Sequence, residues 1–432
     1  MTEAPSGWVR TTLGEAATLI RNGLFASRPT DDATGTRILR ISAVRHGRVD
    51  LTESKHVSGL SAEQIQKYSL QQDDLLFTRY NGSRSLVGIS GLVPRVADSV
   101  IHPDKLIRVT LPDEVNPRFV NFQMEAASAR AHIEGRIKTT AGQSGISGAD
   151  LRSTPLLLPD LEEQRRIVDI LEDHLSRLDA AQEYLASSRR RLAVAHRAIL
   201  SQIIPDVASY PPDWETSTVG DAGLVELGRQ RHPDWHTGPN MRPYLRVANV
   251  FEDEIRTDDL KEMHWPAETF ERFKVHPGDI LLNEGQTPDL LGRPALYRGD
   301  PAEVAFTNSL IRFQAKAGVL PEFALLVFRR HMHAKRFKRE SRITTNIAHL
   351  SAARLKTVEF PIPALEEQRR LVAQADSLLD SNRRVREGIS QAEARGAALR
   401  RAILSAAFAG GLTGRPGDLD SVEELAATGV SA

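Results

Sequence analysis

The six residues Leu161-Glu162-Glu163-Gln164-Arg165-Arg166 recur unchanged as Leu365-Glu366-Glu367-Gln368-Arg369-Arg370, 204 positions later. Each copy follows a proline, Pro159 or Pro363, and opens a long charged stretch punctuated by leucine. A repeat of about half the chain length indicates that one structural unit was used twice, and it predicts an internal two-fold relationship. A period near 205 residues favours tandem domains over a solenoid, because solenoid repeats are about 20–50 residues long.

The duplication extends well beyond these six residues. Further matching pairs, at offsets of 204 to 206, are Trp8 and Trp214, Asp74-Leu75-Leu76 and Asp279-Ile280-Leu281, Leu106-Ile107-Arg108 and Leu310-Ile311-Arg312, and Arg197-Ala198-Ile199-Leu200-Ser201 and Arg401-Ala402-Ile403-Leu404-Ser405. Because the offset drifts by only two residues, nearly the whole unit is duplicated.

Composition limits the class of protein. A length of 432 residues corresponds to roughly three domains, which two globular units and an elongated helical part would satisfy. No run of about 18 apolar residues is present, so we expect no membrane span. The start of the chain, with Glu3 and Pro5, lacks the layout of a signal peptide. Cysteine is absent, which excludes disulfides and thiol chemistry, and we expect a cytoplasmic protein.

Charge is balanced over the chain but not locally. The chain has 56 basic and 56 acidic residues, a balance that argues against a nucleic-acid binder. One segment, however, carries seven basic residues against a single acid, Glu340: Arg329, Arg330, Lys335, Arg336, Lys338, Arg339 and Arg342. With Phe328 and Phe337 on the apolar side of a helix, this segment is predicted to contact phosphates. A solvated basic face is the alternative.

Two segments of about 160 residues have the same mixed plan. Within residues 1–160, apolar runs at 37–44, 75–78 and 106–110 predict strands, and 117–136 predicts a helix. Residues 205–364 repeat this plan, so we expect an α+β protein with two tandem α/β domains.

Two stretches without proline, 161–203 and 365–408, predict long helices. The seven-residue spacings are Leu171, Leu178, Leu185, Leu192 and Ile199 in the first and Leu371, Leu378, Val385, Ala392 and Leu399 in the second. Such heptads favour a coiled coil of roughly 60 Å over amphipathic helices on a globular core. We expect bending or fraying at Gly388 and Gly396. The helical segments are assigned to 161–204 and 365–412, followed by a flexible tail at 413–432.

The repeated hexapeptide begins both helices. Two glutamates in the first turn favour the positive end of the helix dipole, so a good helix start explains the motif on its own. Its unchanged duplication also suggests that the same partner surface docks twice. The candidate docking residues are Leu161, Glu162, Gln164 and Arg165, and Leu365, Glu366, Gln368 and Arg369.

This pattern resembles the specificity subunit of type I restriction-modification systems. The resemblance rests on a proline, the hexapeptide and a long helix ending near Arg-Ala-Ile-Leu-Ser, twice, behind two dissimilar domains, and it covers essentially the whole chain. It implies two target recognition domains, each reading half of a bipartite double-stranded DNA site. The long helices are implied to pack antiparallel as a pseudo-two-fold spacer.

The resemblance also implies the partners. Two methylation subunits would bind S-adenosylmethionine and methylate adenine, and restriction subunits would use ATP and Mg²⁺ to translocate and cleave DNA. This chain itself would bind no cofactor and would be non-catalytic.

One loop in each domain has side chains suited to reading bases. The candidates are Thr78, Arg79, Tyr80, Asn81, Ser83 and Arg84 in the first domain and Asn283, Glu284, Gln286 and Arg293 in the second. Arg can bind guanine, Asn or Gln adenine, and Glu cytosine. Because the two loops differ, they would read different half-sites; ordinary polar turns are the alternative.

No catalytic motif is recognisable. The chain lacks a Walker A loop, a GxGxxG after a strand and an Asn/Asp-Pro-Pro-aromatic motif. His331 and His333 have no carboxylate or further histidine beside them in sequence, so we expect no metal site. Two other hypotheses remain: a self-contained restriction or modification enzyme with a divergent active site, and an assembly scaffold that does not read DNA.

Overall fold

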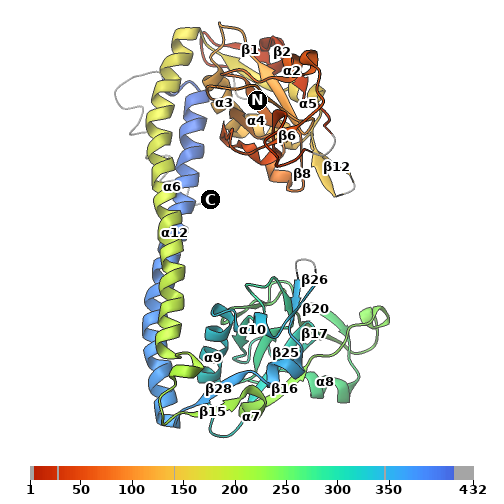
Figure 1. Cartoon of the computed structure of the whole chain (residues 1–432), viewed down its shortest axis with the longest axis vertical. Coiled ribbons are helices and arrows are strands. Elements are labelled where there is room, and N and C mark those ends of the chain that lie inside the picture. The colour runs from red at the N-terminus through yellow and green to blue at the C-terminus, as the bar shows by residue number, and fades with distance from the viewer. Residues whose placement is uncertain (1–3, 27–28, 141, 345–346, 413–432) are drawn as a thin grey trace. The chain divides into compact units, whose positions relative to one another are not determined.

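The structure is a computed structural model that describes residues 4–26, 29–140, 142–344 and 347–412 (Figure 1). The predicted flexible tail at 413–432 lies outside these residues. The chain forms two compact units: unit 1 comprises the described parts of Met1–Leu185 and Ser390–Ala432, and unit 2 is Ala186–Ile389. No helix in the described part of the chain is long and apolar enough to cross a membrane.

Unit 1 is built around a six-stranded sheet with the order β2-β11-β7-β9-β5-β4. These strands are β2 (Leu19–Asn22), β11 (Leu106–Thr110), β7 (Leu75–Thr78), β9 (Ser90–Leu92), β5 (Gly47–Val49) and β4 (Val44–Arg45). The runs predicted at 75–78 and 106–110 are confirmed as β7 and β11, which pair antiparallel at the centre of the sheet. Both are almost entirely buried, which explains why their residues other than Thr78, Arg108 and Thr110 are apolar.

Helices and smaller sheets complete unit 1. The helices are α1 (Leu13–Ala16), α2 (Ala62–Tyr68), α3 (Pro117–Glu125), α4 (Ala127–Glu134) and α5 (Gly148–Arg152). The remaining strands are β1 (Val9–Thr12) with β14 (Pro155–Leu158), β10 (Val100–Ile101) with β3 (Thr36–Leu39) and β6 (Ser54–Val57), and β12 (Lys138–Thr140) with β13 (Gln143–Gly145) and β8 (Tyr80–Asn81). The helix predicted at 117–136 is two helices, because Ala126 has extended backbone angles.

Unit 2 repeats the plan with a four-stranded sheet of order β16-β25-β21-β23. These strands are β16 (Gly223–Leu227), β25 (Leu310–Ala315), β21 (Ile280–Asn283) and β23 (Pro294–Leu296). The smaller sheets are β15 (Glu215–Thr218) with β28 (Glu359–Ile362), β20 (Lys261–His264) with β17 (Met241–Leu245) and β24 (Ala305–Phe306), β18 (Val250–Phe251) with β19 (Glu254–Ile255), and β22 (Gly285–Gln286) with β27 (Ile347–His349) and β26 (Arg342–Thr344). Its helices include α7 (Val219–Ala222), α8 (Ala267–Phe273), α9 (Pro321–His333), α10 (Arg336–Arg339) and α11 (Ala352–Lys356).

A buried ion pair recurs in the two cores. Arg108 Nε lies 2.9 Å from Asp74 Oδ2 in unit 1, and Arg312 NH1 lies 3.6 Å from Asp279 Oδ2 in unit 2. Arg108 in β11 is equivalent to Arg312 in β25. Asp74, just before β7, is equivalent to Asp279, just before β21. Buried charges are stable only when paired, so this duplicated pair is part of the shared frame.

The predicted long helices are confirmed as α6 (Leu161–Ile203) and α12 (Leu365–Phe408). In unit 1, Leu171 near the start of α6 packs in one cluster with Leu404 near the end of α12. In unit 2, Leu200 near the end of α6 shares a cluster with Leu371 near the start of α12. The two helices are therefore antiparallel, as Figure 1 shows.

The heptad predicted for the second helix is wrong in its middle. Leu378 and Val385 are 38% and 51% exposed. The buried positions are Leu371, Ala375, Leu379, Asn382 and Ile389. Counting leucines missed this seam because it uses a small and a polar residue. The expected fraying is also wrong, since α12 continues as helix through Gly388 and Gly396.

Candidate nucleic-acid interface

Both predicted reading loops contain a short strand of a small three-stranded sheet. In unit 1, β8 pairs with β13, so that Asn81 lies opposite Ser144, and β12 completes the sheet. In unit 2, β22 pairs with β27, so that Gln286 lies opposite Ala348, and β26 completes it. We call these two structures the small polar sheets. Figure 1 shows β8 and β12 on the side of unit 1 away from α6.

Sequence reasoning missed the hairpins that complete the small polar sheets. Residues 138–145 and 342–349 are related by the same offset of 204, and each begins with a basic residue followed by β-branched residues. The paired β-branched residues Thr139 and Thr140, and Ile343 and Thr344, are a strand signal that could have identified them. Lys138, Thr140 and Gln143 are exposed in unit 1, and His349 is exposed in unit 2.

Some of the unit 1 candidates are buried or held by hydrogen bonds within the unit, and others lie at its surface. Thr78 is buried as the last residue of β7, which removes it from the base-reading set. Arg79 donates to the Asp104 carbonyl at 3.2 Å, and its guanidinium lies 4.6 Å from the centre of the Tyr80 ring. Arg84 donates to the Glu134 carbonyl at 2.8 Å.

Asn81 and Ser83 form an exposed polar turn in unit 1. The Ser83 backbone N–H donates to Asn81 Oδ1 at 2.9 Å, which fixes the asparagine side chain. Asparagine recognises adenine with both its amide oxygen and its NH₂ group, so Asn81 would use the second lone pair of Oδ1 for the base.

The unit 2 candidates divide in the same way. Asn283 is fully buried at the position equivalent to Thr78, so it too is removed from the base-reading set. Arg293 lies 4.5 Å over the Phe251 ring, and burial lowers its pKa. Glu284 Oε2 lies 3.2 Å from His349 Nδ1 across the small polar sheet, and Gln286 is half-exposed.

The basic segment is mostly internal, contrary to its predicted role. Arg329 pairs with Glu252 at 2.9 Å and Arg330 with Asp206 at 2.6 Å, and both arginine side chains are buried. Arg336 binds Glu359 at 2.8 Å and Glu340. These three arginines connect separate segments of unit 2, because Glu252, Asp206 and Glu359 lie far from them in the sequence.

The four remaining members of the basic segment are Lys335, Lys338, Arg339 and Arg342. Lys335 is exposed and lies 2.8 Å from the exposed Asp289. Lys338 and Arg339 are exposed on α10. The side chain of Arg342 lies outside the described residues. The phosphate-binding prediction is therefore narrowed to the exposed lysines and Arg339.

The glutamines of the repeated hexapeptide are buried and do not form a docking surface. Gln164 Oε1 accepts from the Asn116 backbone N–H at 2.8 Å, and its Nε2 donates to the Pro159 carbonyl at 2.9 Å. Gln368 is 0% exposed and binds backbone groups in the same way. The other predicted docking residues, Leu161, Glu162, Arg165, Leu365, Glu366 and Arg369, are exposed or half-exposed.

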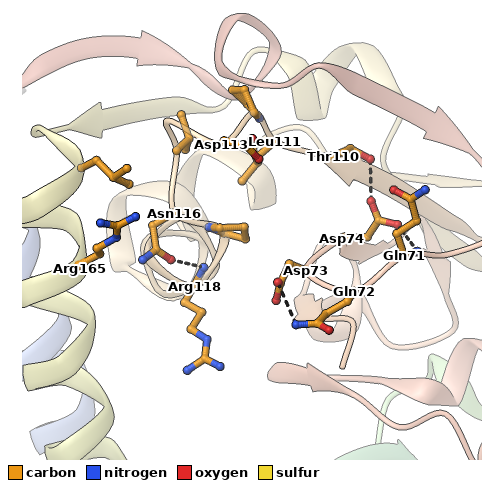
Figure 2. Close-up of a pocket in the computed structure, with 14 residues that line it drawn as sticks. Gln71, Gln72, Asp73, Asp74, Thr110, Leu111, Asp113, Asn116, Arg118 and Arg165 are labelled. Atoms are coloured by element: carbon orange, nitrogen blue, oxygen red, sulfur yellow. Dashed lines mark hydrogen bonds between the residues drawn. The ribbon is translucent and has the colours of Figure 1, made fainter. Parts of the chain in front are cut away.

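A polar pocket of about 440 Å³ lies beside the start of α6 in unit 1. Figure 2 shows Arg165 and Arg118 on one side of it and Asp73 on the other. Arg118 also pairs with Glu172 at 2.6 Å. The exposed part of the hexapeptide therefore borders a hollow with charges of both signs.

His333 has partners that the sequence did not indicate. Its Nε2 lies 3.0 Å from Glu252 Oε2, and His196 Nε2 lies 3.0 Å from Glu252 Oε1. Burial favours the neutral acid, but hydrogen bonds from His196 and His333 and the charge of Arg329 hold the pKa of Glu252 well below its usual range. His331 lies apart from this group and contacts the Glu359 carbonyl.

Two units of one plan, each joined to antiparallel long helices and each carrying a small polar sheet, define a duplicated two-domain protein on a helical frame. The family model described as type I restriction modification DNA specificity domain matches residues 5–185 and again 211–391. The chain therefore belongs to this family.

Individual relatives agree with this assignment. The chain is 37% identical over 215 residues to the EcoKI specificity subunit of a type I restriction enzyme from Escherichia coli K12, an alignment that spans 48% of this chain and 46% of that protein. The chain thus matches about half the length of that relative. It is 22% identical over 428 residues to a putative type I MjaX specificity subunit from Methanocaldococcus jannaschii, covering 90% and 92% of the two chains.

A solved structure supports the fold. A chain from work on complex assembly and conformational transition of the type I R-M system superposes with a TM-score of 0.68 at 18% identity. The superposition covers 94% of this chain and 99% of that one.

Proposed function

We propose that the chain is the DNA-specificity subunit of a type I restriction-modification system, with each unit reading one half of a bipartite asymmetric site. The observation that carries this proposal is a contrast within the repeat. The frame is duplicated down to single hydrogen bonds, as at Gln164 and Gln368. The small polar sheets occupy equivalent places but carry different side chains, such as Asn81 and Gln286.

Within the small polar sheets, side chains that reach the surface are the candidates for base contacts. In unit 1 these are Tyr80, Asn81, Ser83 and Gln143, and in unit 2 they are Glu284, Gln286 and His349. Amides suit adenine, and a carboxylate suits the amino group of cytosine. Arg79, Arg84 and Arg293 are assigned a supporting role, because each is held by a contact within its own unit. Lys138, Lys335, Lys338 and Arg339 are candidates for phosphate contacts, which set register without reading sequence.

The exposed hexapeptide residues are the proposed docking sites for two methylation subunits, with Leu161, Glu162 and Arg165 at one and Leu365, Glu366 and Arg369 at the other. The methylation subunits would supply S-adenosylmethionine and methylate adenine. Restriction subunits would add ATP- and Mg²⁺-dependent cleavage. The long helices would set the spacing between half-sites.

The test is to map methylated adenines in host DNA with and without this chain, co-expressed with its methylation subunits. The expected result is one bipartite motif that depends on the chain. Asn81→Ala should relax one half of the motif and Gln286→Ala the other. Asn283→Ala is the matched control. Asn283 lies three residues before Gln286 but is buried, so its replacement should leave the motif unchanged.

Other outcomes would overturn the proposal. Methyl transfer or cleavage by the purified chain alone would favour the self-contained enzyme. A reconstituted complex that enriches no bipartite sequence from random duplexes would favour the scaffold. Equal loss of both half-sites on changing Asn81 would assign that residue to folding.

A further inference from the structure

Three potential metal ligands meet in unit 2 from three separate elements. His196 lies on α6, Glu252 lies in the turn between β18 and β19, and His333 is the last residue of α9. One ligand atom from each lies within 4.8 Å of the others. Both imidazole Nε2 atoms are directed at the Glu252 carboxylate, each at 3.0 Å from one of its oxygens.

The distances are close to those of a bound ion. Zinc binds imidazole nitrogen and carboxylate oxygen at about 2.0–2.2 Å, so two ligand atoms at a tetrahedral angle lie about 3.4 Å apart. The three ligand atoms lie within 4.8 Å of one another, so side-chain movements of about 1 Å would bring them onto one ion. His196 is 7% exposed, whereas Glu252 and His333 are 22% and 24% exposed, which gives an ion and a water ligand an entrance.

Nearby charges balance around the cluster. The charged groups are the carboxylates Glu252, Asp253 and Asp376 and the guanidinium groups of Arg293, Arg298 and Arg329. With neutral histidines the three carboxylates balance the three guanidinium groups, so an ion would be held by its three ligands and not by an excess of negative charge. Arg329 Nε contacts Glu252 Oε1 at 2.9 Å, so it can orient the carboxylate while the other oxygen binds an ion.

The equivalent place in unit 1 provides an internal comparison. Offsets of 204 to 206 relate Arg400 to His196, Glu125 to Arg329 and His46 to Glu252. There, Arg400 NH2 donates to Glu125 Oε2 at 2.9 Å. Both units thus join a long helix to the globular domain through charged groups at the same position. Only unit 2 does so with two imidazoles and a carboxylate, and arginine cannot serve as a ligand.

We propose that His196, Glu252 and His333 form a binding site for a divalent transition-metal ion of the zinc class, which fastens α6 to the globular part of unit 2. Two imidazoles and one carboxylate are a known zinc ligand set, with water in the fourth position. On binding, each ring proton moves from Nε2 to Nδ1, so that both Nε2 lone pairs face the ion. The site is independent of the proposed reading of DNA.

The test is equilibrium dialysis of the full chain against chelator-buffered zinc, followed by metal analysis by emission spectroscopy. The expected result is about one zinc per chain. Cobalt(II) should give the visible absorption of a four-coordinate site. His196→Ala and His333→Ala should lose this binding, whereas His46→Ala, at the unit 1 position equivalent to Glu252, and the exposed His232→Ala should retain it.

The remaining outcomes decide against the proposal. A wild-type chain that binds no zinc would show a purely hydrogen-bonded cluster, and His196→Ala or His333→Ala with unchanged binding would place the ion elsewhere. If His196→Ala fails to fold by circular dichroism, His333→Gln at the more exposed position replaces it. Zinc should also raise the thermal midpoint of the wild type but not that of the folded ligand variants.

Discussion

Gln368 makes in unit 2 the contacts that Gln164 makes in unit 1. Gln164 Oε1 accepts from the Asn116 backbone N–H, and Gln368 Oε1 accepts from the Leu320 backbone N–H, both at 2.8 Å. Each Nε2 donates to the carbonyl of the proline before its helix. The side-chain amide of glutamine supplies a donor and an acceptor on separate atoms, which matches the carbonyl and the N–H that it bridges at both positions.

Changing either glutamine to alanine should destabilise its own unit. Gln164→Ala leaves a backbone N–H and a carbonyl unsatisfied, and we expect a loss of about 1–3 kcal/mol in unit 1. Gln368→Ala should do the same in unit 2. Urea unfolding checks both, with the exposed Arg165→Ala as control, expected within about 0.5 kcal/mol of wild type. A glutamine variant with wild-type stability but weak binding of methylation subunits would restore the docking role.

Replacing the glycines of α12 should stabilise the protein. A Cβ atom at Gly388 or Gly396 meets nothing within 4 Å. Because glycine in a helix interior costs about 0.5–1 kcal/mol relative to alanine, Gly388→Ala and Gly396→Ala should each raise stability by that amount. Thermal unfolding followed by circular dichroism at 222 nm measures the change. A fall in the unfolding midpoint would mean that these positions are covered in solution.

One buried histidine in each unit should make stability depend on acid. Burial lowers the pKa of His102 and of His331 to about 4. Because the folded pKa lies below the unfolded value of about 6.5, the unfolded state binds more protons. Stability is full above pH ~6.5 and is lost as pH falls towards 4, by on the order of 3 kcal/mol per histidine.

Urea midpoints measured across that pH range check this prediction. His102→Gln should reduce the loss of folding stability that unit 1 shows as the pH falls, and it should leave the loss in unit 2 unchanged. His349→Gln, at an exposed position, should change neither. A His102→Gln chain that loses stability as steeply as wild type between these pH values would contradict the assignment.

A buried asparagine should restrict how the long helices pair. Asn382 is 6% exposed, and its Nδ2 donates to the Leu192 carbonyl at 3.4 Å. Its Oδ1 has no hydrogen-bond partner in the described structure. A leucine there should stabilise unit 2 by roughly 1 kcal/mol but reduce the specificity of helix register. Hydrogen exchange of α6 residues near Leu192 measures both effects; slower exchange without added heterogeneity would contradict the register role.

Features with local signals were predictable from sequence. The long helices follow from stretches without proline, and β7 and β11 follow from continuous apolar runs. Features that depend on distant partners were not predictable. Arg329 reads as a surface residue because its carboxylate partner, Glu252, lies 77 positions away. His196 and His333 likewise meet only through the fold.

The small polar sheets were found only in part for the same reason. A strand of two residues such as β8 has no periodicity of its own, and its partner β13 follows more than 60 residues later. The sequence could therefore place the proposed base-reading side chains near the right strand. It could not predict which of them are buried and which are exposed. Thr78 and Asn283 show this limit, since each is polar and each lies in the core.

The anchoring amides of Gln164 and Gln368 bind backbone groups of the globular domains and no side chain. This contact alone therefore places no demand on which side chains the neighbouring domain carries, provided that a helix begins at the same place. The side-chain contacts of Arg400 with Glu125 and of His196 with Glu252 do place such a demand. A different domain could therefore be mounted on the same helix only if it kept a suitable partner at this one position.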